Sequence, residues 1–296
     1  MRHHRITLKL AFVGTIAGCL LVVTRPATAQ IVIDGGWQAI FHEDQPERLA
    51  GPELGDYLGL PINEAARAFG EAWDASRLTI PEHQCRAHSA AYLYRGPLNL
   101  RIWSERDPDT EQVIAIHQDT SNFQQRRVIW MDGRSHPSDK AAHTWMGFST
   151  GRWDGDTLVV TTTHVKQMWH RRNGLPQSDK IRLTEYFIRH GDVMTYITHT
   201  EDPVYLTEPL VKTTNLRYTP RELTPQQLLY PCQNVVEVAA LKRGQVPHYL
   251  PGENPFIKEF QTRQHIPAIA AKGGAETMYP EFSDKVKAAL AATPAK

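Results

Sequence analysis

The sequence predicts a mainly β protein, in which an antiparallel barrel carries one helix on its N-terminal side and a wrapping segment at its C-terminus. Between about residues 90 and 218, short runs rich in β-branched and aromatic residues follow one another. Several of the connectors between them contain Asp-Gly or Gly-Asp, which favour hairpin turns. A sheet of about eight to ten such strands usually closes on itself, because closure removes its exposed edges. A β-sandwich is the alternative, since the number of strands does not distinguish closure from two packed sheets.

The first 29 residues have the pattern of a secretory signal peptide. Basic residues are followed by an apolar run at 10–23, and an Ala-Thr-Ala sequence then precedes Gln30. We expect cleavage before Gln30, which places the mature protein in the periplasm or outside the cell. The alternative is a lipoprotein anchored at Cys19, whose preceding residues resemble a lipobox. Because the residues after Cys19 remain apolar, we favour plain cleavage.

The composition excludes several classes of protein. The chain has 296 residues, of which 41% are apolar and 22% are charged, and this balance excludes a disordered chain. Residues 1–29 hold four basic residues and no acid, so the 33 Lys and Arg of the whole chain fall to 29, against 32 Asp and Glu. A mildly acidic mature protein is not expected to bind nucleic acid, and no later apolar stretch is long enough for a membrane span. Two cysteines remain, Cys85 and Cys232, and in an oxidising compartment they form either a disulfide bond or two separate buried thiols.

Residues 30–88 form the first segment of the mature chain and hold the clearest helical pattern. A helix is expected from about 62 to 75, with Asn63 as its N-cap and several alanines in its body. Phe69 and Trp73 stand four residues apart. We therefore expect them to share one face of the helix and to pack against the rest of the protein.

Residues 89–220 hold the predicted barrel, and residues 221–296 are expected to wrap around it. Strands are expected at 31–33, 91–94, 99–104, 112–117, 127–131, 156–163, 180–190, 193–199 and 209–218. The C-terminal segment is expected to hold helices near 225–229 and 283–292, with Pro-rich stretches between them.

The most specific sequence pattern lies in the middle of the predicted barrel. It runs from 143 to 149 and on through the hairpin sequence Gly-Arg-Trp-Asp-Gly-Asp-Thr-Leu-Val-Val at 151–160. Together with 172–174 and 202–203, it resembles a large family of exported bacterial proteins of unknown function, over roughly residues 37–218. The family has a lipocalin-like look, which implies a barrel with a small-molecule cavity. The resemblance implies no reaction.

Three residues are candidates for chemistry. Side-chain alternation along 181–189 places Glu185 and Arg189 on the apolar face of a strand. Glu185 is therefore either part of a buried polar network or an acid/base group in a cavity. His143 is the candidate general base, because histidine transfers protons readily near neutral pH. Glu185 would then be the partner of His143 or the acid, and Arg171, or its neighbour Arg172, would stabilise developing negative charge.

The connector at 164–179 is long enough to be functional and is rich in aromatic and basic side chains. The ligand-binding candidates are Trp145, His164, Trp169, His170, Arg172 and Arg189. Flat aromatic rings, guanidiniums and imidazoles suit an anionic or aromatic ligand at the mouth of a barrel. The alternative is a solvated basic loop in which Trp169 covers apolar surface.

Two functions are consistent with these residues, and both need a small-molecule ligand or substrate. The first is an exported enzyme, a metal-independent lyase, isomerase or hydrolase that uses acid/base chemistry on a partly apolar or aromatic substrate in the barrel cavity. The second is a non-catalytic periplasmic protein that binds a ligand there, and a structural envelope protein is a third class. Convergence of His143, Glu185 and the 164–179 connector on one pocket would favour the enzyme. No metal or cofactor is expected, because compact ligand spacings and nucleotide fingerprints are absent from the sequence.

Overall fold

The computed structural model describes residues 31–40, 52–79, 86–95, 99–120, 125–220, 242 and 244–292. The signal segment, both mature cysteines Cys85 and Cys232, and the helix expected at 225–229 lie outside these ranges, so these remain predictions. None of the helices within the described ranges is both long and apolar enough to cross a bilayer.

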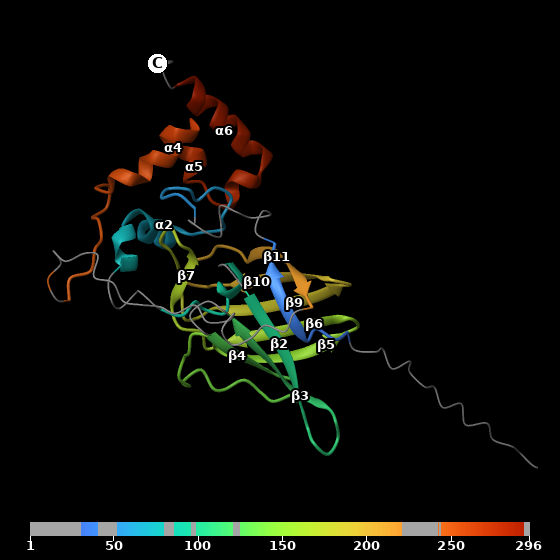
Figure 1. Ribbon diagram of the computed structural model, residues 1–296. Coiled ribbons are helices and arrows are strands. Elements are labelled where there is room, and N and C mark those ends of the chain that lie inside the picture. The colour runs from blue at the N-terminus through green and yellow to red at the C-terminus, as the bar shows by residue number, and fades with distance from the viewer. Residues whose placement is uncertain are drawn as a thin grey trace, which may run out of the picture.

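Within the described ranges, nine strands close into a barrel, as the sequence predicts (Figure 1). They are β1 (Gly35–Ala39), β2 (Asn99–Arg106), β3 (Val113–Thr120), β4 (Gln125–Trp130), β5 (Phe148–Asp154), β6 (Thr157–Thr163), β9 (Arg182–His190), β10 (Val193–Glu201) and β11 (Leu210–Thr219). The order around the barrel is β1, β11, β10, β9, β6, β5, β4, β3 and β2. Pairing of β1 with both β2 and β11 completes the closure, so the sandwich alternative is excluded.

One pair of neighbouring strands departs from the expected antiparallel meander. β4 and β5 run parallel, with Ile129 opposite Ser149. Parallel neighbours need a connection that returns along the barrel, and the segment 131–147 makes it on the outside of the wall. There the His136 ring contacts Thr150 of β5 and Thr163 of β6, which alternate with the inward Ser149 and Thr162.

A packed apolar core lies inside the barrel. Trp37, Leu100, Ile116, Phe187 and Leu216 are essentially inaccessible to solvent there. The indole N–H of Trp37 donates to the carbonyl of Ile33 at 2.9 Å, which satisfies its one polar group inside the core. The expected strand at 31–33 is therefore a coil that leads into β1, rather than a strand of its own.

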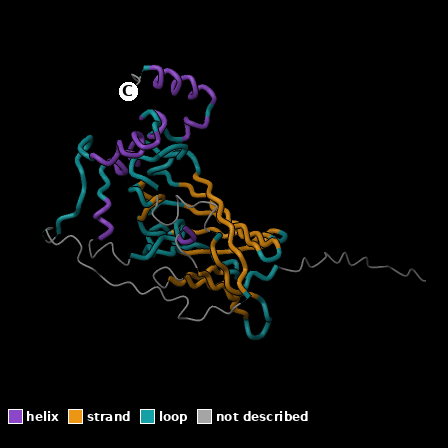
Figure 2. The backbone as a smooth tube through the Cα atoms, turned by 45° about the horizontal axis from the view of Figure 1, so that its top comes forward, coloured by secondary structure: helices purple, strands orange, loops and turns teal. Residues whose placement is uncertain are grey.

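The helices gather at one end of the barrel, here called the cap end, where β6 ends and β9 begins (Figures 1 and 2). The cap consists of α2 (Glu64–Glu71), η2 (Ala75–Thr79), the hairpin of β7 (Met168–Arg171) and β8 (Leu175–Gln177), and the C-terminal elements η5 (Pro255–Lys258), α4 (Glu259–Gln264), α5 (Ala268–Ala271), η6 (Ala275–Met278) and α6 (Pro280–Ala291). The Asn254 side chain donates to the carbonyls of Glu71 and Trp73 at 3.0 and 2.9 Å. These bonds join the C-terminal segment to α2, and α6 confirms the helix expected at 283–292.

The predicted helix and its cap are both present, but the helix is shorter than expected. The Asn63 side chain accepts from the Ala66 backbone N–H at 3.0 Å, and α2 ends at Glu71. Trp73 is buried, whereas Phe69 is 48% exposed. The expectation that both pack inward is therefore wrong for Phe69. Trp73 lies beyond the end of the helix, so the two side chains do not share a helical face.

Two other expectations are corrected near the cap. The residues expected as a strand at 91–94 instead form turns and η3 (Leu93–Arg95). Tyr92, Leu93 and Tyr94 are all buried, a pattern that an alternating strand on one sheet face does not produce. The 164–179 connector contains the β7–β8 hairpin, which the sequence reading missed.

Candidate functional site

Glu185 is fully enclosed in the barrel, where it pairs with Arg127 of β4. One guanidinium nitrogen of Arg127 donates to Glu185 Oε1 at 2.8 Å, and the other donates to Oε2. The Tyr196 hydroxyl donates to Oε1 at 2.6 Å, and the Thr162 hydroxyl donates to Oε2 at 3.1 Å. Ser149 Oγ accepts from the same guanidinium at 3.0 Å. Of the two alternatives for Glu185, the structure shows the buried network.

The charges in this network support each other. Burial by itself would lower the pKa of Arg127, but the adjacent Glu185 carboxylate raises it. Burial and the same carboxylate raise the pKa of Tyr196 well above its ordinary value. Arg127 therefore stays charged, and Tyr196 remains a neutral donor to the Glu185 oxygens.

The partner of Glu185 is not the one that shares its strand. Arg189 lies at the far end of β9, over the rings of Trp37 and Tyr218 at 5.3 and 5.1 Å, and it donates to the Gly191 carbonyl. Arg127 was missed, although a signal for it existed. Alternation along β4 places Arg127 on the same face as the buried Ile129.

A chain of hydrogen bonds links two histidines on the outer wall near the cap end. His164 Nε2 lies 2.9 Å from the Ser138 carbonyl, which can only accept, so this nitrogen carries a proton. With both rings neutral, His164 Nδ1 then accepts from the Thr163 hydroxyl at 2.7 Å. Thr163 in turn accepts from His136 Nδ1 at 2.7 Å, and His136 Nε2 accepts from the Thr150 hydroxyl at 2.9 Å. The Ser138 carbonyl therefore sets the donor and the acceptor of each hydrogen bond in this series.

His164 holds this arrangement at a backbone cost. Its φ of 59° lies in the left-handed region, which is unfavourable for a residue with a side chain. Its carbonyl accepts from the Thr144 backbone N–H at 2.9 Å, and Lys166 N–H donates back to Thr144 at 2.8 Å. These bonds fix the turn beside His143.

A cleft of about 330 Å³ opens next to the histidines and is called here the histidine cleft. Its walls are formed by Asp139, His143, His164, Asp179, Lys180 and Ile181. His143 Nδ1 lies 3.1 Å from the Val165 carbonyl, so this nitrogen donates and the neutral ring keeps its lone pair on Nε2. Within the described ranges Nε2 has no hydrogen-bond partner. Two sequence candidates, His143 and His164, thus share one concave site.

His143 and Glu185 do not meet, so the predicted pairing between them is not formed. Glu185 is enclosed by Arg127, Thr162 and Tyr196 inside the barrel, whereas His143 contacts Val165 in the loop beneath the cap. No three His, Cys, Asp or Glu side chains of the described residues are grouped as a metal ion would require.

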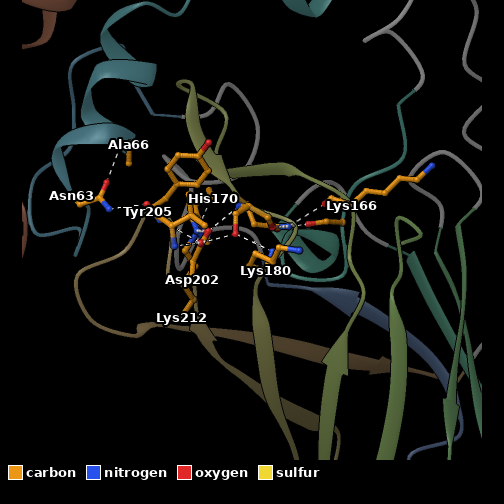
Figure 3. A network of polar contacts seen from close by, with 12 residues as sticks. Asn63, Ala66, Lys166, His170, Lys180, Asp202, Tyr205 and Lys212 are labelled. Carbon is orange, nitrogen blue, oxygen red and sulfur yellow. Dashed lines mark hydrogen bonds and ion pairs between the residues drawn. The ribbon is translucent and has the colours of Figure 1, made fainter. Parts of the chain in front are cut away.

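His170 belongs to a second buried network, centred on Asp202 (Figure 3). His170 Nε2 lies 3.1 Å from Asp202 Oδ2, and the Ser178 hydroxyl donates to Oδ1 at 2.7 Å. Burial alone would raise the pKa of Asp202, but these bonds lower it to about 2. Burial lowers the pKa of His170 in spite of its bond to Asp202. His170 is buried and bonded to Asp202, so it anchors the β7–β8 hairpin to the barrel. It does not line the histidine cleft.

The remaining candidates, three in the connector and Trp145 before β5, also lie outside the histidine cleft. Arg171 donates to the Asp56 carbonyl at 3.0 Å and so ties β7 to the residues before α2. Burial and the charge of Arg172 lower the pKa of His88 to about 4, which places Arg172 near His88. Trp169 packs edge-on against Trp73 with ring centres 5.5 Å apart. Trp145 lies beside Lys166, whose ammonium nitrogen is 5.0 Å from the ring centre.

Comparison with known proteins identifies one distant structural similarity. No known protein family matches the chain, and no curated protein matches it either. Among solved structures, the chain is similar to the wild-type fluorescent protein UnaG, with 10% sequence identity over 63% of this chain and 97% of that chain, and a TM-score of 0.26. A superposition at this level carries no argument about function. The family resemblance of the 143–160 pattern stays a prediction.

Proposed function

We propose that this chain is a small-molecule-binding barrel protein and that its ligand lies in the histidine cleft. The observation that carries the proposal is the state of His143. Its Nδ1 donates to the Val165 carbonyl, and its Nε2, which has no protein partner within the described ranges, belongs to a side chain that lines a concave site. Polar groups fixed in this way, among a few other polar side chains, are typical of ligand sites.

The charges around the cleft restrict the ligand. Lys180 offers a cation at the rim, although its ammonium lies 4.0 Å from Asp179 Oδ1. Asp139 adds a second carboxylate, and Ile181 contributes an apolar contact. A ligand with one anionic group for Lys180 and one hydroxyl or acidic proton for His143 matches this wall. A multiply charged anion does not, because two carboxylates would repel it.

The proposal is tested by identifying the small molecules that the purified protein retains. The purified chain is incubated with bacterial lysate, washed, and the retained molecules are identified by mass spectrometry. We expect one small molecule whose retention is lost in His143→Gln and in Lys180→Gln. His190→Gln is the matched control and should retain it, because His190 is an exposed residue at the hairpin of the opposite barrel end. Equal retention by all three variants would overturn the proposal.

Acid/base catalysis is a second candidate function, supported by the same nitrogen. In that reading His143 Nε2 removes a proton from the bound molecule, and the Lys180 ammonium stabilises the negative charge that forms. Glu185 takes no part, since its oxygens are occupied by Arg127 and Tyr196. The two functions separate once the molecule is known: an enzyme converts it, and His143→Gln then binds it without conversion. A wild-type protein that returns the molecule unchanged is a binding protein.

The predicted export is part of the proposal. It is supported by the basic, apolar and Ala-Thr-Ala pattern of residues 1–29. Cell fractionation followed by N-terminal sequencing checks it, with Gln30 as the expected first residue. A lipid-modified Cys19 would instead indicate the lipoprotein alternative.

A further inference from the structure

Residues 135–143, called here the strap, form one wall of the histidine cleft. The strap belongs to the connection between β4 and β5, and it supplies Asp139 and His143 to the cleft. The opposite wall comes from residues that directly follow β6 or directly precede β9, among them His164 and Lys180. The cleft therefore exists only while the strap lies against the barrel.

Within the described ranges, every hydrogen bond that joins the strap to the rest of the protein passes through an imidazole. These bonds are those of His136 with the Thr150 and Thr163 hydroxyls at 2.9 and 2.7 Å, of His164 with the Ser138 carbonyl at 2.9 Å, and of His143 with the Val165 carbonyl at 3.1 Å. Histidine is the side chain that changes its charge most readily near neutral pH. The attachment of the strap is therefore sensitive to acid.

The series of bonds between His136 and His164 accepts one extra proton but not two. With both rings neutral, the Thr163 hydroxyl accepts from His136 and donates to His164. One added proton can be accommodated, because the hydroxyls of Thr163 and Thr150 can reverse the direction of their bonds. With both rings protonated, two N–H groups point at Thr163 Oγ1, and the proton of this hydroxyl loses its acceptor.

The surroundings of His136 oppose its protonation. Burial and the charges of His164 and of Arg182 on β9 lower the pKa of His136. The ring of Phe148, whose centre is 5.2 Å away, meets His136 edge to face and carries no charge. His136 is therefore more easily protonated once the strap has left the wall.

The charges around His143 and His164 are mixed. Asp139 and Asp179 bring two carboxylates to the cleft, and Lys180 brings an ammonium group. Because a carboxylate attracts an imidazolium, the first proton has a place in the cleft, and the second then meets the cationic surroundings of His136.

We propose that the strap is an acid-sensitive gate of the histidine cleft, which is closed at neutral pH and opens when His136 and His164 are both protonated. Opening separates Asp139 and His143 from the opposite wall and releases a bound molecule. A ring that the closed state keeps neutral stabilises this state above about pH 6.5, the ordinary value for histidine, and the stabilisation is lost as the pH falls. The part that concerns release rests on the proposed function.

Nuclear magnetic resonance relaxation of the backbone amides tests the gate without any ligand. At about pH 7.5 we expect order parameters of about 0.85 in the strap, and at about pH 5 we expect them to fall below about 0.6. β10 pairs on both sides, with β9 and β11, and is the internal reference whose order parameters should not change. Strap order parameters that stay equal at the two pH values would overturn the proposal.

Two variants identify the groups that open the gate. His136→Gln stays neutral but keeps a donor and an acceptor, so its strap should remain ordered at about pH 5. Arg182→Gln removes a cation that acts on His136 and should move the opening to lower pH. His190→Gln, at the opposite barrel end, is the matched control and should behave as the wild type.

An unchanged acid response in His136→Gln would overturn the assignment. If this variant is already open at neutral pH, Arg182→Gln decides, because an opening that does not shift in it excludes His136 as the responsible ring.

The retention assay, repeated at the two pH values, separates this inference from the proposed function. Release at about pH 5 by the wild type but not by His136→Gln supports both. Equal retention at both pH values by a protein whose strap loosens would overturn the gate alone. A strap that loosens in a protein retaining nothing at either pH would overturn the binding proposal and leave the acid-sensitive strap in place.

Discussion

The Arg127–Glu185 network inside the barrel and the histidine cleft are both polar, but they differ in how completely their groups are satisfied. Inside the barrel, Glu185 is 0% exposed and receives donors from Arg127, Thr162 and Tyr196. In the cleft, His143 has one nitrogen committed and one open. A closed network stabilises one structure, whereas an open acceptor on a concave wall is available to a ligand. Glu185, the inward-facing charge that the strand pattern identifies in the sequence, is therefore a structural residue.

The largest expected effect comes from breaking the interior network. Glu185→Gln leaves Arg127 buried without its countercharge, so we expect a loss of about 3–5 kcal/mol in the free energy of unfolding. Urea unfolding measures it. A Glu185→Leu/Arg127→Met double variant, which removes both charges, should recover much of the loss. A loss below about 1 kcal/mol in the single variant would show that the pair does not hold the interior together.

A smaller loss is expected at the network that anchors the hairpin. Asp202→Asn removes one of two acceptor oxygens that serve His170, Ser178 and the Val204 backbone N–H. We expect about 2 kcal/mol of destabilisation, concentrated in faster amide exchange of β7 and β8. Unchanged exchange in this hairpin would mean that Asp202 does not anchor it.

Acid should destabilise the cap end through its histidines. Burial lowers the pKa of His88 to about 4 and also lowers the pKa values of His136 and His170. Unfolding frees these rings to bind protons below about pH 6.5, the ordinary value for histidine. Their contribution to stability is therefore complete above that pH and is lost as the pH falls toward 4.

Melting temperatures between pH 8 and pH 4 check this expectation. For a domain of this size, each lost kcal/mol lowers the melting temperature by about 2–4 °C. His88→Gln removes one of the three groups and should flatten the acid side of the profile. A melting temperature independent of pH over this range contradicts the expectation.

The smallest effect on stability should accompany the largest effect on function. His143→Gln removes a half-buried ring with one bond to a carbonyl, so we expect a change of about 0.5 kcal/mol or less. Retention of the cleft ligand should nevertheless disappear. A variant that melts several degrees lower would place His143 with Glu185 among the structural residues and remove the contrast between the two regions.

The sequence by itself determined the features that depend on local geometry. Alternation along β9 placed Glu185 inside, turn residues placed the hairpins, and Asn63 marked the start of α2. Each depends on the period of a strand, the preferences of a turn or a single capping bond, and these act over a few residues.

Only the tertiary structure decided which distant groups meet. Arg127 and Glu185 stand 58 positions apart and pair because barrel closure brings β4 and β9 to face one interior. The parallel step from β4 to β5 sends the 131–147 segment outside, where His136 reaches Thr163 and His164 lies beside His143. Alternation assigns a side chain to a face, but it does not choose the partner across that face. The partner follows from strand order and register, which many long-range contacts set together when the barrel closes.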